Sequence, residues 1–417
     1  MKLRSFVNFL GLVFLAFLCA TLLASPGFAA GKGPIKIGFI AATTGNFANF
    51  GGGMVKGFKL YLDEINWTVA GRKIEFISED ESTNPAVAVT KARALIKNDG
   101  VNMVAGVFLQ SSGYSVGPVC AEAGVPCIVT NSGADDLTLR KRSPYVIRIN
   151  WGSGGELGHV AGDYAYKKLG WRKALVCAMD YAWGHEVSGG FQQVFEHLGG
   201  QVIQKVWTPI NTADYAPYIP GLNPEADGII DVITGAATIR FLKALQMSGR
   251  KWQVIGPGPV TDETFLPALG DLANGVYTSF AYSGALQTKG NKEYLEEYHK
   301  KYSGIPAAFA AMNYTAARWI VQAIKAVNGD VENKQKFLAA LKAVEIPDSL
   351  RGPVRLDKYG AIVQNQYIRK TEKVNGNYQN TVVQTYPNCN QFWPFDPDEY
   401  LKQPPYSRDF PPCKYCK

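Results

Sequence analysis

Histidine is scarce in this chain, and its four histidines are spaced in a way that argues against metal binding or catalysis. None of His159, His185, His197 and His299 is followed by another three or four residues later, the spacing that a metal site on a helix needs. All four lie in segments with helical periodicity rather than in loops, and no Gly-x-Ser-x-Gly motif is present. The sequence predicts neither a nucleophilic enzyme nor a metal site, and we expect no cofactor.

Clustered positive charge is also missing. The net charge is +8, but the densest basic run is only Arg140–Arg142, and such runs are not interleaved with aromatic residues as a nucleic-acid groove requires. Hydrophobic residues make up 47% of the 417 residues, which excludes a disordered or collagen-like chain. We therefore expect two globular domains and no nucleic-acid partner.

Only one apolar run approaches the length of a membrane span. Phe6–Leu23 follows Lys2 and Arg4 and precedes a helix-breaking Ser-Pro-Gly and small residues, a pattern typical of a secretory signal peptide over residues 1–29. An uncleaved anchor is the alternative, because 18 residues nearly suffice to cross a bilayer. Lipid attachment at Cys19 is disfavoured by the bulky residue before it. We expect a soluble, periplasmic protein.

Cysteine is limited to seven residues, and export to an oxidising compartment makes disulfides possible. One pair is expected among Cys389, Cys413 and Cys416, in a tail rich in proline and aromatic residues, with its connectivity open. Cys120 and Cys127 flank a turn and either pair or are merely buried. No second Cys/His pair is placed to complete a zinc site with the C-terminal Cys-x-x-Cys.

Short β-branched runs alternate with amphipathic helical stretches along the chain. This alternation is typical of α/β folds, in which parallel sheets carry helices on both faces. Ten strands exceed one sheet of ordinary size, so we expect two sheets with a ligand cleft between them. The predicted strands are Ile35–Ala41, Lys73–Ser78, Val101–Phe108, Pro126–Thr130, Tyr145–Ile149, Lys173–Ala178, Gln201–Trp207, Gly228–Thr234, Trp252–Gly256 and Gly275–Phe280.

Polar loops follow three of these strands, at Thr43–Phe50, Gln110–Gly113 and Asn131–Gly133. Ligands of open α/β sheets bind beyond the carboxyl ends of the strands. Hydroxyls, amides and backbone N–H groups there can hold a carboxylate, although the same residues also serve as helix caps and turns. A fourth loop places Tyr181 and Trp183 at a strand-to-helix turn, where they stack on a ligand or are simply buried.

Gly152–Gly158 imitates a dinucleotide-binding fingerprint, because it follows a strand, opens a helix and precedes Asp180 by about twenty residues. The match is loose, since three residues separate the last two glycines. We expect no dinucleotide here.

Several motifs occur in an order that matches one known family. They are Lys36–Ile40 leading into Thr44-Gly45, the helix Gly57–Asn66, Ser78-Glu79-Asp80 before Asn84-Pro85, Gln110-Ser111-Ser112, Asp180–Gly184, Ile255-Gly256-Pro257 and Gly352–Asp357. From about Ile35 to about Gln384 the chain resembles the leucine/isoleucine/valine-binding family of periplasmic solute receptors for ABC transporters.

The resemblance implies a type I periplasmic binding protein, in which two Rossmann-like lobes with parallel central sheets are joined by a three-strand hinge. The hinge crossings are expected near Ile149–Gly152, Phe280–Ser283 and Gly352–Lys358. Lobe 1 is then expected to comprise residues 30–149 and 283–352, lobe 2 residues 150–282 and 353–385, and a C-terminal extension residues 386–417.

The resemblance also implies ligand-contacting positions. An acidic residue that holds the ligand's amino group in many members should follow Gly256-Pro257, where this sequence has Gly258; Asp262 or Glu263 could substitute only from four or five positions further on. The family's other contact positions, with Asn131 and Tyr181 added from the loops above, fall on Phe50, Gln110, Ser111, Ser112, Asn131, Ser132, Gly133, Tyr181, Trp183, Thr234 and Gly235.

These features predict a non-enzymatic, monomeric solute-binding protein of an ABC importer that captures its ligand by lobe closure and partners a membrane permease. Because no acid stands at Gly258, we hypothesise a carboxylic acid without an amino group, such as an aromatic acid, with a branched-chain amino acid as the alternative. The rival functions are an exported enzyme acting on small acids and the ligand-sensing domain of a receptor.

Overall fold

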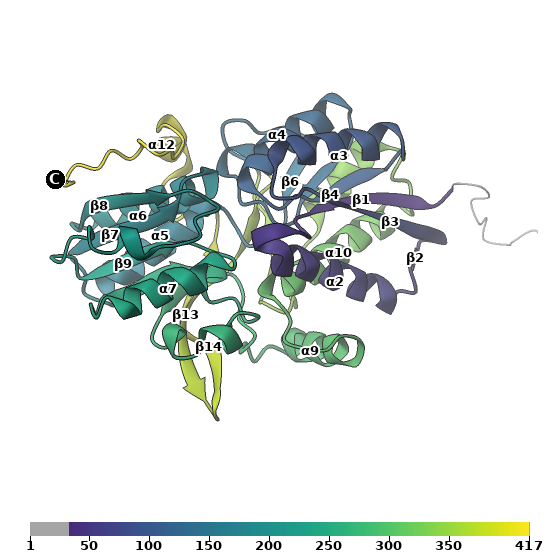
Figure 1. The fold of residues 1–417 in the computed structure, drawn as a ribbon. Coiled ribbons are helices and arrows are strands. Elements are labelled where there is room, and N and C mark those ends of the chain that lie inside the picture. The colour runs from purple at the N-terminus through teal and green to yellow at the C-terminus, as the bar shows by residue number, and fades with distance from the viewer. Residues whose placement is uncertain (1–32, 417) are drawn as a thin grey trace, which may run out of the picture.

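The computed structural model describes residues 33–416, so the predicted signal peptide lies outside the described part. Two α/β lobes stand side by side (Figure 1). We call the part built on the six-stranded sheet lobe 1 and the part built on the eight-stranded sheet lobe 2. The fold is the predicted one of two largely parallel sheets with helices packed on them.

The sheet of lobe 1 has the order β2-β3-β1-β4-β5-β6 and is parallel except for the β2–β3 pair. Strand β1 is buried on both faces from Ile37 onward, which explains why its sequence is apolar there. The strands are β1 Ile35–Ala41, β2 Thr68–Val69, β3 Arg72–Asp80, β4 Met103–Gly106, β5 Cys127–Val129 and β6 Val146–Arg148.

Helices from both ends of the sequence cover lobe 1. Helix α10 packs along α2, and the contact is so close that a Cβ on Gly57 would lie 1.9 Å from the carbonyl oxygen of Ala310. The helical elements are η1 Gly45–Phe47, α2 Ala48–Glu64, α3 Pro85–Lys97, α4 Gln110–Glu122, η2 Asp135–Leu137, α9 Lys289–Lys301, α10 Ala308–Ala326 and α11 Lys334–Ala343.

The sheet of lobe 2 has the order β12-β13-β11-β10-β9-β7-β8, with β14 paired to β13. Strands β7 to β11 are parallel, whereas β13 is antiparallel to its neighbours β11, β12 and β14. The strands are β7 Lys173–Met179, β8 Gln201–Thr208, β9 Gly228–Val232, β10 Gln253–Pro257, β11 Tyr277–Phe280, β12 Arg355–Leu356, β13 Ile362–Val374 and β14 Asn377–Cys389.

Helices α5 and α6 form a tightly packed pair in lobe 2. A Cβ on Gly158 would lie 2.2 Å from the carbonyl oxygen of Val187, so this glycine is needed for helix contact. Ser153 and Glu156 form a capping box that starts α5. The last glycine of the segment that imitates a dinucleotide motif, Gly158, thus serves helix packing. The helical elements are α5 Gly154–Lys167, α6 Ala182–His197, η3 Ala216–Tyr218, α7 Ala237–Met247, η4 Gly258–Thr261, α8 Leu266–Leu269, η5 Gly270–Ala273 and α12 Pro397–Lys402.

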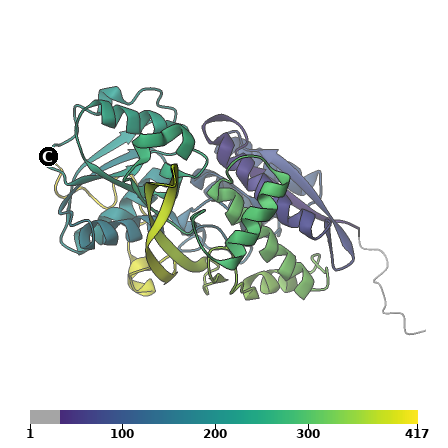
Figure 2. The same ribbon diagram turned by 90° about the horizontal axis from the view of Figure 1, so that it is seen from below.

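All ten predicted strands are present, but the long β13–β14 hairpin was not predicted. It extends beyond the sheet and lies near the seam between the lobes (Figures 1 and 2). Its turn is Asn375-Gly376, both at positive φ, which is the two-residue hairpin signal that sequence inspection could have used.

Three segments connect the lobes. The chain passes from β6 to α5, returns from β11 to α9, and passes again from α11 to β12 and β13. At the first passage the Arg148 guanidinium donates to the carbonyl oxygens of Gly133 and Gly152, at 3.4 and 2.8 Å. It therefore holds the connecting segment close to lobe 1.

The C-terminal segment is more ordered than its sequence suggests. β14 continues to Cys389, four residues into the predicted extension, and α12 follows. Arg140 of lobe 1 donates to the carbonyls of Tyr400 and Gln403, at 3.0 and 2.9 Å, which docks α12 beside the seam. The expected tail disulfide joins Cys413 to Cys416. The other four described cysteines, Cys120, Cys127, Cys177 and Cys389, are free and buried.

Candidate functional site

A pocket lies in the seam between the lobes, at the carboxyl ends of their strands. Lobe 1 contributes the start of α2, the loops after β4 and β5 and the start of α10, while the first connecting segment and lobe 2 supply the rest. The pocket is lined by Phe47, Phe50, Phe108, Gln110, Asn131, Trp151, Tyr181, Trp183, Thr234, Pro259 and Phe309.

Aromatic rings dominate this lining and contact one another across elements. The ring centroids of Phe50 and Phe309 are 4.7 Å apart, and those of Phe47 and Phe108 are 5.2 Å apart. Trp151 and Trp183 meet edge to face at 5.2 Å. Such a cage offers a ligand both ring faces and ring edges, which favours another flat aromatic molecule over a compact aliphatic one.

Four polar atoms on the lining side chains are buried and have no hydrogen-bond partner in the described part of the chain. They are Nε2 of Gln110, Oδ1 of Asn131, Nε1 of Trp151 and Nε1 of Trp183. Asn131 donates its Nδ2 to the carbonyl of Phe108 at 3.2 Å, which leaves Oδ1 as the free acceptor. An unmade buried hydrogen bond costs about 1–3 kcal/mol, so four at one place indicate a polar ligand.

No lining residue in the described chain carries a carboxylate or a cationic group. At Gly258, where the family resemblance places an acid, a Cβ would lie 2.2 Å from the ring of Phe280. That ring packs against Trp151 and Phe309, at 6.0 and 5.9 Å. The space for an ammonium-binding acid is therefore filled by an aromatic ring.

The two acidic residues that follow in the sequence, Asp262 and Glu263, make their hydrogen bonds outside the pocket. Asp262 accepts the backbone N–H of Ala308 at 3.0 Å and the hydroxyl of Thr264 at 2.7 Å. Glu263 accepts Arg369 at 3.2 Å and the backbone N–H of Gly284 at 3.2 Å. Both carboxylates are buried in these contacts and neither lines the seam pocket. They do not substitute for the missing acid.

The backbone N–H groups of the two residues just before α4 are hydrogen-bonded within the protein. Glu81 accepts the N–H groups of Phe108 and Leu109, at 3.1 and 2.9 Å. Burial raises the pKa of Glu81 to about 7, although these hydrogen bonds lower it. The sequence suggested that such N–H groups could hold a ligand carboxylate, but at these two positions the carboxylate of Glu81 takes that place.

Of the predicted contact residues, six line the pocket: Phe50, Gln110, Asn131, Tyr181, Trp183 and Thr234. The remaining six do not line it.

Ser111 is half-buried and its carbonyl accepts the hydroxyl of Ser115. The Ser112 hydroxyl lies beside the Glu81 carboxylate. The carbonyl of Ser132 accepts Asn150 Nδ2 at 2.7 Å. The contacts of Ser111 and Ser132 are made by their backbone carbonyls, and the buried Ser112 hydroxyl faces Glu81 rather than the pocket lining.

Three glycines permit close approach. A Cβ on Gly133 would lie 2.1 Å from the Trp151 ring, and one on Gly235 would lie 2.8 Å from Phe47. Gly258 makes room for Phe280 as described. These predicted positions therefore shape the pocket by having no side chain.

Five lining residues were missed: Phe47, Phe108, Trp151, Pro259 and Phe309. Phe47 lies within the first polar loop and Phe108 at the end of a predicted strand. Both are apolar, so they do not stand out where polar residues were expected to bind the ligand. Trp151 stands at a predicted hinge crossing. Phe309 comes from a helix more than 250 residues from Phe47, and no local pattern in the sequence connects the two.

The lobes are closed over the pocket. The backbone N–H of Ala236 in lobe 2 donates to the carbonyl of Asn46 in lobe 1 at 3.4 Å. The space left between the lining side chains is about 20 Å³, room for about one water molecule. A ring-sized ligand can enter only if the lobes or the rings move apart, and this geometry suits a protein that encloses its ligand.

The described residues contain no cluster of three or more His, Cys, Asp or Glu placed to hold a metal ion. The four histidines lie in helices α5, α6 and α9, as predicted. His159 is buried against Tyr406, and burial lowers its pKa to about 3, so it stays neutral. Between residues 33 and 416, no helix combines the length and apolarity that crossing a membrane requires.

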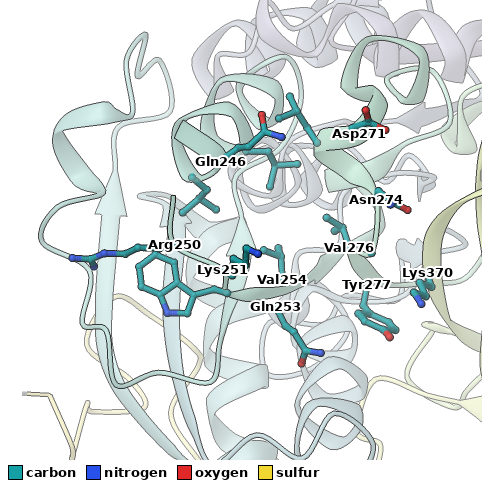
Figure 3. A pocket seen from close by; sticks show the side chains of 15 residues that line it. Gln246, Arg250, Lys251, Gln253, Val254, Asp271, Asn274, Val276, Tyr277 and Lys370 are labelled. Carbon is teal, nitrogen blue, oxygen red and sulfur yellow. The ribbon is translucent and has the colours of Figure 1, made fainter. Parts of the chain in front are cut away.

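A larger depression of about 510 Å³ lies on lobe 2, between α7, β10 and η5 (Figure 3). Gln246, Arg250, Lys251 and Lys370 are among its lining residues, and none of the predicted contact positions reaches it. It lacks the buried, unpartnered polar atoms of the seam pocket. The seam pocket is therefore the candidate ligand site.

Comparison with known proteins agrees with this geometry. The family described as periplasmic binding protein matches residues 34–376. The Leu/Ile/Val-binding protein homolog 6 of Brucella melitensis biotype 1 is 30% identical over 366 residues, which cover 84% of this chain and 91% of that protein.

Two solved structures are also similar. An ABC transporter substrate-binding protein from Sphaerobacter thermophilus is 34% identical, with a TM-score of 0.80, covering 86% of this chain and 99% of that one. A solute-binding protein of an ABC transporter from Rhodopseudomonas palustris BisB5, in complex with 3,4-dihydroxybenzoic acid, is 31% identical, with a TM-score of 0.81 and the same coverage.

Proposed function

The chain belongs to the periplasmic binding protein family and is an extracytoplasmic solute-binding protein of an ABC importer; from this premise we propose that its ligand is an aromatic carboxylic acid bearing a ring hydroxyl. Lobe closure around the ligand then presents the closed surface to a membrane permease. We propose further that the signal peptide directs the chain to the periplasm and that no chemical step follows binding.

The single observation that carries the proposal is an uncharged aromatic pocket with four unpartnered polar atoms. Three of the atoms are N–H donors, on Gln110, Trp151 and Trp183, and one is an acceptor, on Asn131. Donors satisfy carboxylate oxygens, and the acceptor satisfies a hydroxyl. A hydroxybenzoate carries both groups on a flat ring that fits between aromatic side chains.

The same pocket disfavours an α-amino acid. An ammonium group in a buried site needs a carboxylate or several acceptors, because an unpaired buried charge is costly. Among the fully buried side-chain atoms of the described lining residues, Asn131 Oδ1 is the only acceptor without a hydrogen-bond partner, and Gly258 leaves no space for an acid. The similar Rhodopseudomonas palustris protein in complex with 3,4-dihydroxybenzoic acid supports the same ligand class.

Isothermal titration of the purified, ligand-stripped protein tests the proposal. We expect 4-hydroxybenzoate to bind with a Kd in the micromolar range or below, benzoate to bind more weakly, and leucine to show no heat of binding. Tight leucine binding without binding of either acid would overturn the proposed ligand class. Turnover of the bound acid, followed by chromatography, would overturn the absence of chemistry.

Asn131→Leu sharpens this test. Losing the acceptor should reduce the preference for 4-hydroxybenzoate over benzoate by about tenfold, because one buried hydrogen bond is worth about 1.4 kcal/mol in this comparison. Asn98→Leu, on the exposed end of α3, is the matched control and should leave the preference unchanged. An unchanged preference in Asn131→Leu would remove the hydroxyl from the proposal.

A further inference from the structure

A hydrogen bond joins the two lobes behind the ligand pocket. Tyr114 on α4 of lobe 1 donates its hydroxyl to Oε1 of Glu186 on α6 of lobe 2, at 2.5 Å. The same hydroxyl accepts the backbone N–H of Asp136 at 3.1 Å. Glu186 Oε1 also accepts the backbone N–H of Asp135 at 3.4 Å. All of these partners of Glu186 belong to lobe 1.

The groups that face Glu186 are mostly acidic. Asp135 lies beside it: a Cβ on Gly154 would be 2.9 Å from Glu186 Oε2 and 3.6 Å from Asp135 Oδ1. The Asp135 carboxylate accepts the backbone N–H of Gly155 at 3.2 Å. Arg148 on β6 is the nearby cation, but its guanidinium donates to neutral oxygens of Thr138, Gln391 and the backbone. One shared cation faces two buried carboxylates.

Other charged groups surround the Asp135–Glu186 pair at a greater distance. Lys141 lies over the Tyr114 ring at 5.7 Å, and Asp136 is paired with Arg140 at 2.7 Å. Burial, and then the charge of Asp135, raise the pKa of Glu156 on α5, and Glu156 accepts a hydrogen bond from Gln366 at 2.7 Å. The remaining titratable groups are Tyr181, at the start of α6, and Tyr400 and Tyr406 of the C-terminal segment, which lie near Asp135. None of these supplies a second positive charge to Glu186.

The buried pair therefore cannot hold two negative charges at modest cost. Oε2 of Glu186 is buried and has no partner among the described residues. Burial, and then the charge of Asp135, raise the pKa of Glu186 well above its ordinary value. Burial also raises the pKa of Asp135, to about 6. When the lobes separate, Tyr114 and Asp135 move away with lobe 1, and water can reach Glu186.

We infer that closure of the lobes takes up one proton on the Asp135–Glu186 pair, so that ligand affinity rises as pH falls. The inference rests on the proposed function, because it needs lobe closure on ligand binding. No bond other than that to the proton is made or broken. The proton comes from the solvent when the lobes close and returns to it when they open.

Titration calorimetry with 4-hydroxybenzoate at pH 7, in phosphate and in Tris, measures the proton directly. The two buffers differ in ionisation enthalpy, so the difference in observed heat gives the number of protons taken up. We expect about one proton for the wild type and about none for Glu186→Gln. Between pH 7 and pH 8 the wild-type affinity should fall by up to tenfold, the limit for one linked proton.

Glu196→Gln is the matched control. Glu196 lies on the same helix, and its partners Gln192 and the N–H of Val202 are both in lobe 2, so closure leaves its surroundings unchanged. We expect this variant to take up one proton like the wild type. Tyr114→Phe should keep the proton uptake but weaken binding by about fivefold, since the cross-lobe hydrogen bond is lost.

Equal proton uptake by wild type and Glu186→Gln, whether one or none, would overturn the inference while leaving the proposed function standing. If 4-hydroxybenzoate does not bind, the proposed ligand fails, and small-angle scattering of the ligand-free protein then decides. The inference requires a smaller radius of gyration at pH 5.5 than at pH 8.5, and no such change in Glu186→Gln. A radius independent of pH in the wild type would overturn it.

Discussion

Two neighbouring parts of the seam between the lobes differ in the chemistry of their side chains. The ligand pocket joins aromatic rings with neutral amides and indoles, and no described lining residue is charged. Directly behind it, Tyr114, Asp135, Arg148 and Glu186 form a buried network of ionisable groups. Both parts assemble only when the lobes meet. The pocket recognises the ligand by shape and neutral hydrogen bonds, whereas the network responds to closure itself.

The comparison explains why an acid is tolerated in one place and excluded from the other. In the network each carboxylate receives hydrogen bonds from Tyr114 or from backbone N–H groups. At Gly258 the Phe280 ring fills the space that an acidic side chain would need, and the nearby Arg369 guanidinium already donates to the Gly258 carbonyl at 2.8 Å. A buried carboxylate survives only where donors surround it.

Gly258→Asp introduces a carboxylate beside the uncharged pocket and is expected to have the largest effect. The new side chain would collide with the Phe280 ring, since even a Cβ comes within 2.2 Å, and overpacking of this kind costs about 3 kcal/mol of the free energy of unfolding. Urea denaturation measures the loss. Gly221→Asp, where the nearest atom to a Cβ would be the Tyr218 carbonyl oxygen at 3.9 Å, should change stability by less than about 0.5 kcal/mol. Leucine binding by a stable Gly258→Asp protein would contradict our account of this position.

Trp183→Ala tests the neutral pocket. It removes a ring and an unpartnered indole N–H, so affinity for 4-hydroxybenzoate should fall by about 2 kcal/mol, or about thirtyfold. Trp183→Phe, which keeps a ring, should lose less. Trp252→Ala in the outer depression of lobe 2 is the control for calorimetry. Unchanged affinity in Trp183→Ala would place the ligand elsewhere.

Glu156→Gln tests the buried ionisable groups near the pocket through the free energy of unfolding. Burial raises the pKa of Glu156 to about 7, above its usual value of about 4.3. Between these two values the folded protein holds a proton that the unfolded chain releases. Stability is therefore greatest below the lower value and falls as pH rises through the higher one.

We expect the free energy of unfolding of the wild type to fall by about 1–2 kcal/mol more between pH 5 and pH 7 than that of Glu156→Gln. Glutamine preserves the capping box, so the variant should fold. Denaturation curves at the two pH values provide the measurement. Parallel pH dependence in both proteins would show that Glu156 is ionised throughout.

Ser112→Ala should have the smallest effect. Ser112 is a predicted contact position, yet its hydroxyl lies beside Glu81 and does not line the pocket. Affinity for 4-hydroxybenzoate should change by less than about twofold in calorimetry. A loss of tenfold or more would mean that Ser112 reaches the ligand after all.

Local sequence was sufficient for most secondary structure and for half of the site. Strand β1 was predicted with its observed bounds, because six of its seven residues are apolar or glycine and buried, as is typical of an inner parallel strand. Asn131, Tyr181 and Trp183 were identified because strand ends and helix starts are visible in the pattern of residues. The β13–β14 hairpin was missed although its Asn375-Gly376 turn was available as a signal.

The amino-acid sequence by itself determined the α/β class, the family and the absence of an acid at Gly258, since each depends on residue type and order along the chain. Only the tertiary structure decided that Phe309 faces Phe50, that Phe280 fills the place of the missing acid, and that Glu186 meets Tyr114. The physical reason is that burial and hydrogen bonding depend on which distant segments pack together between the lobes. Periodicity along the chain indicates only which face of a single segment is buried.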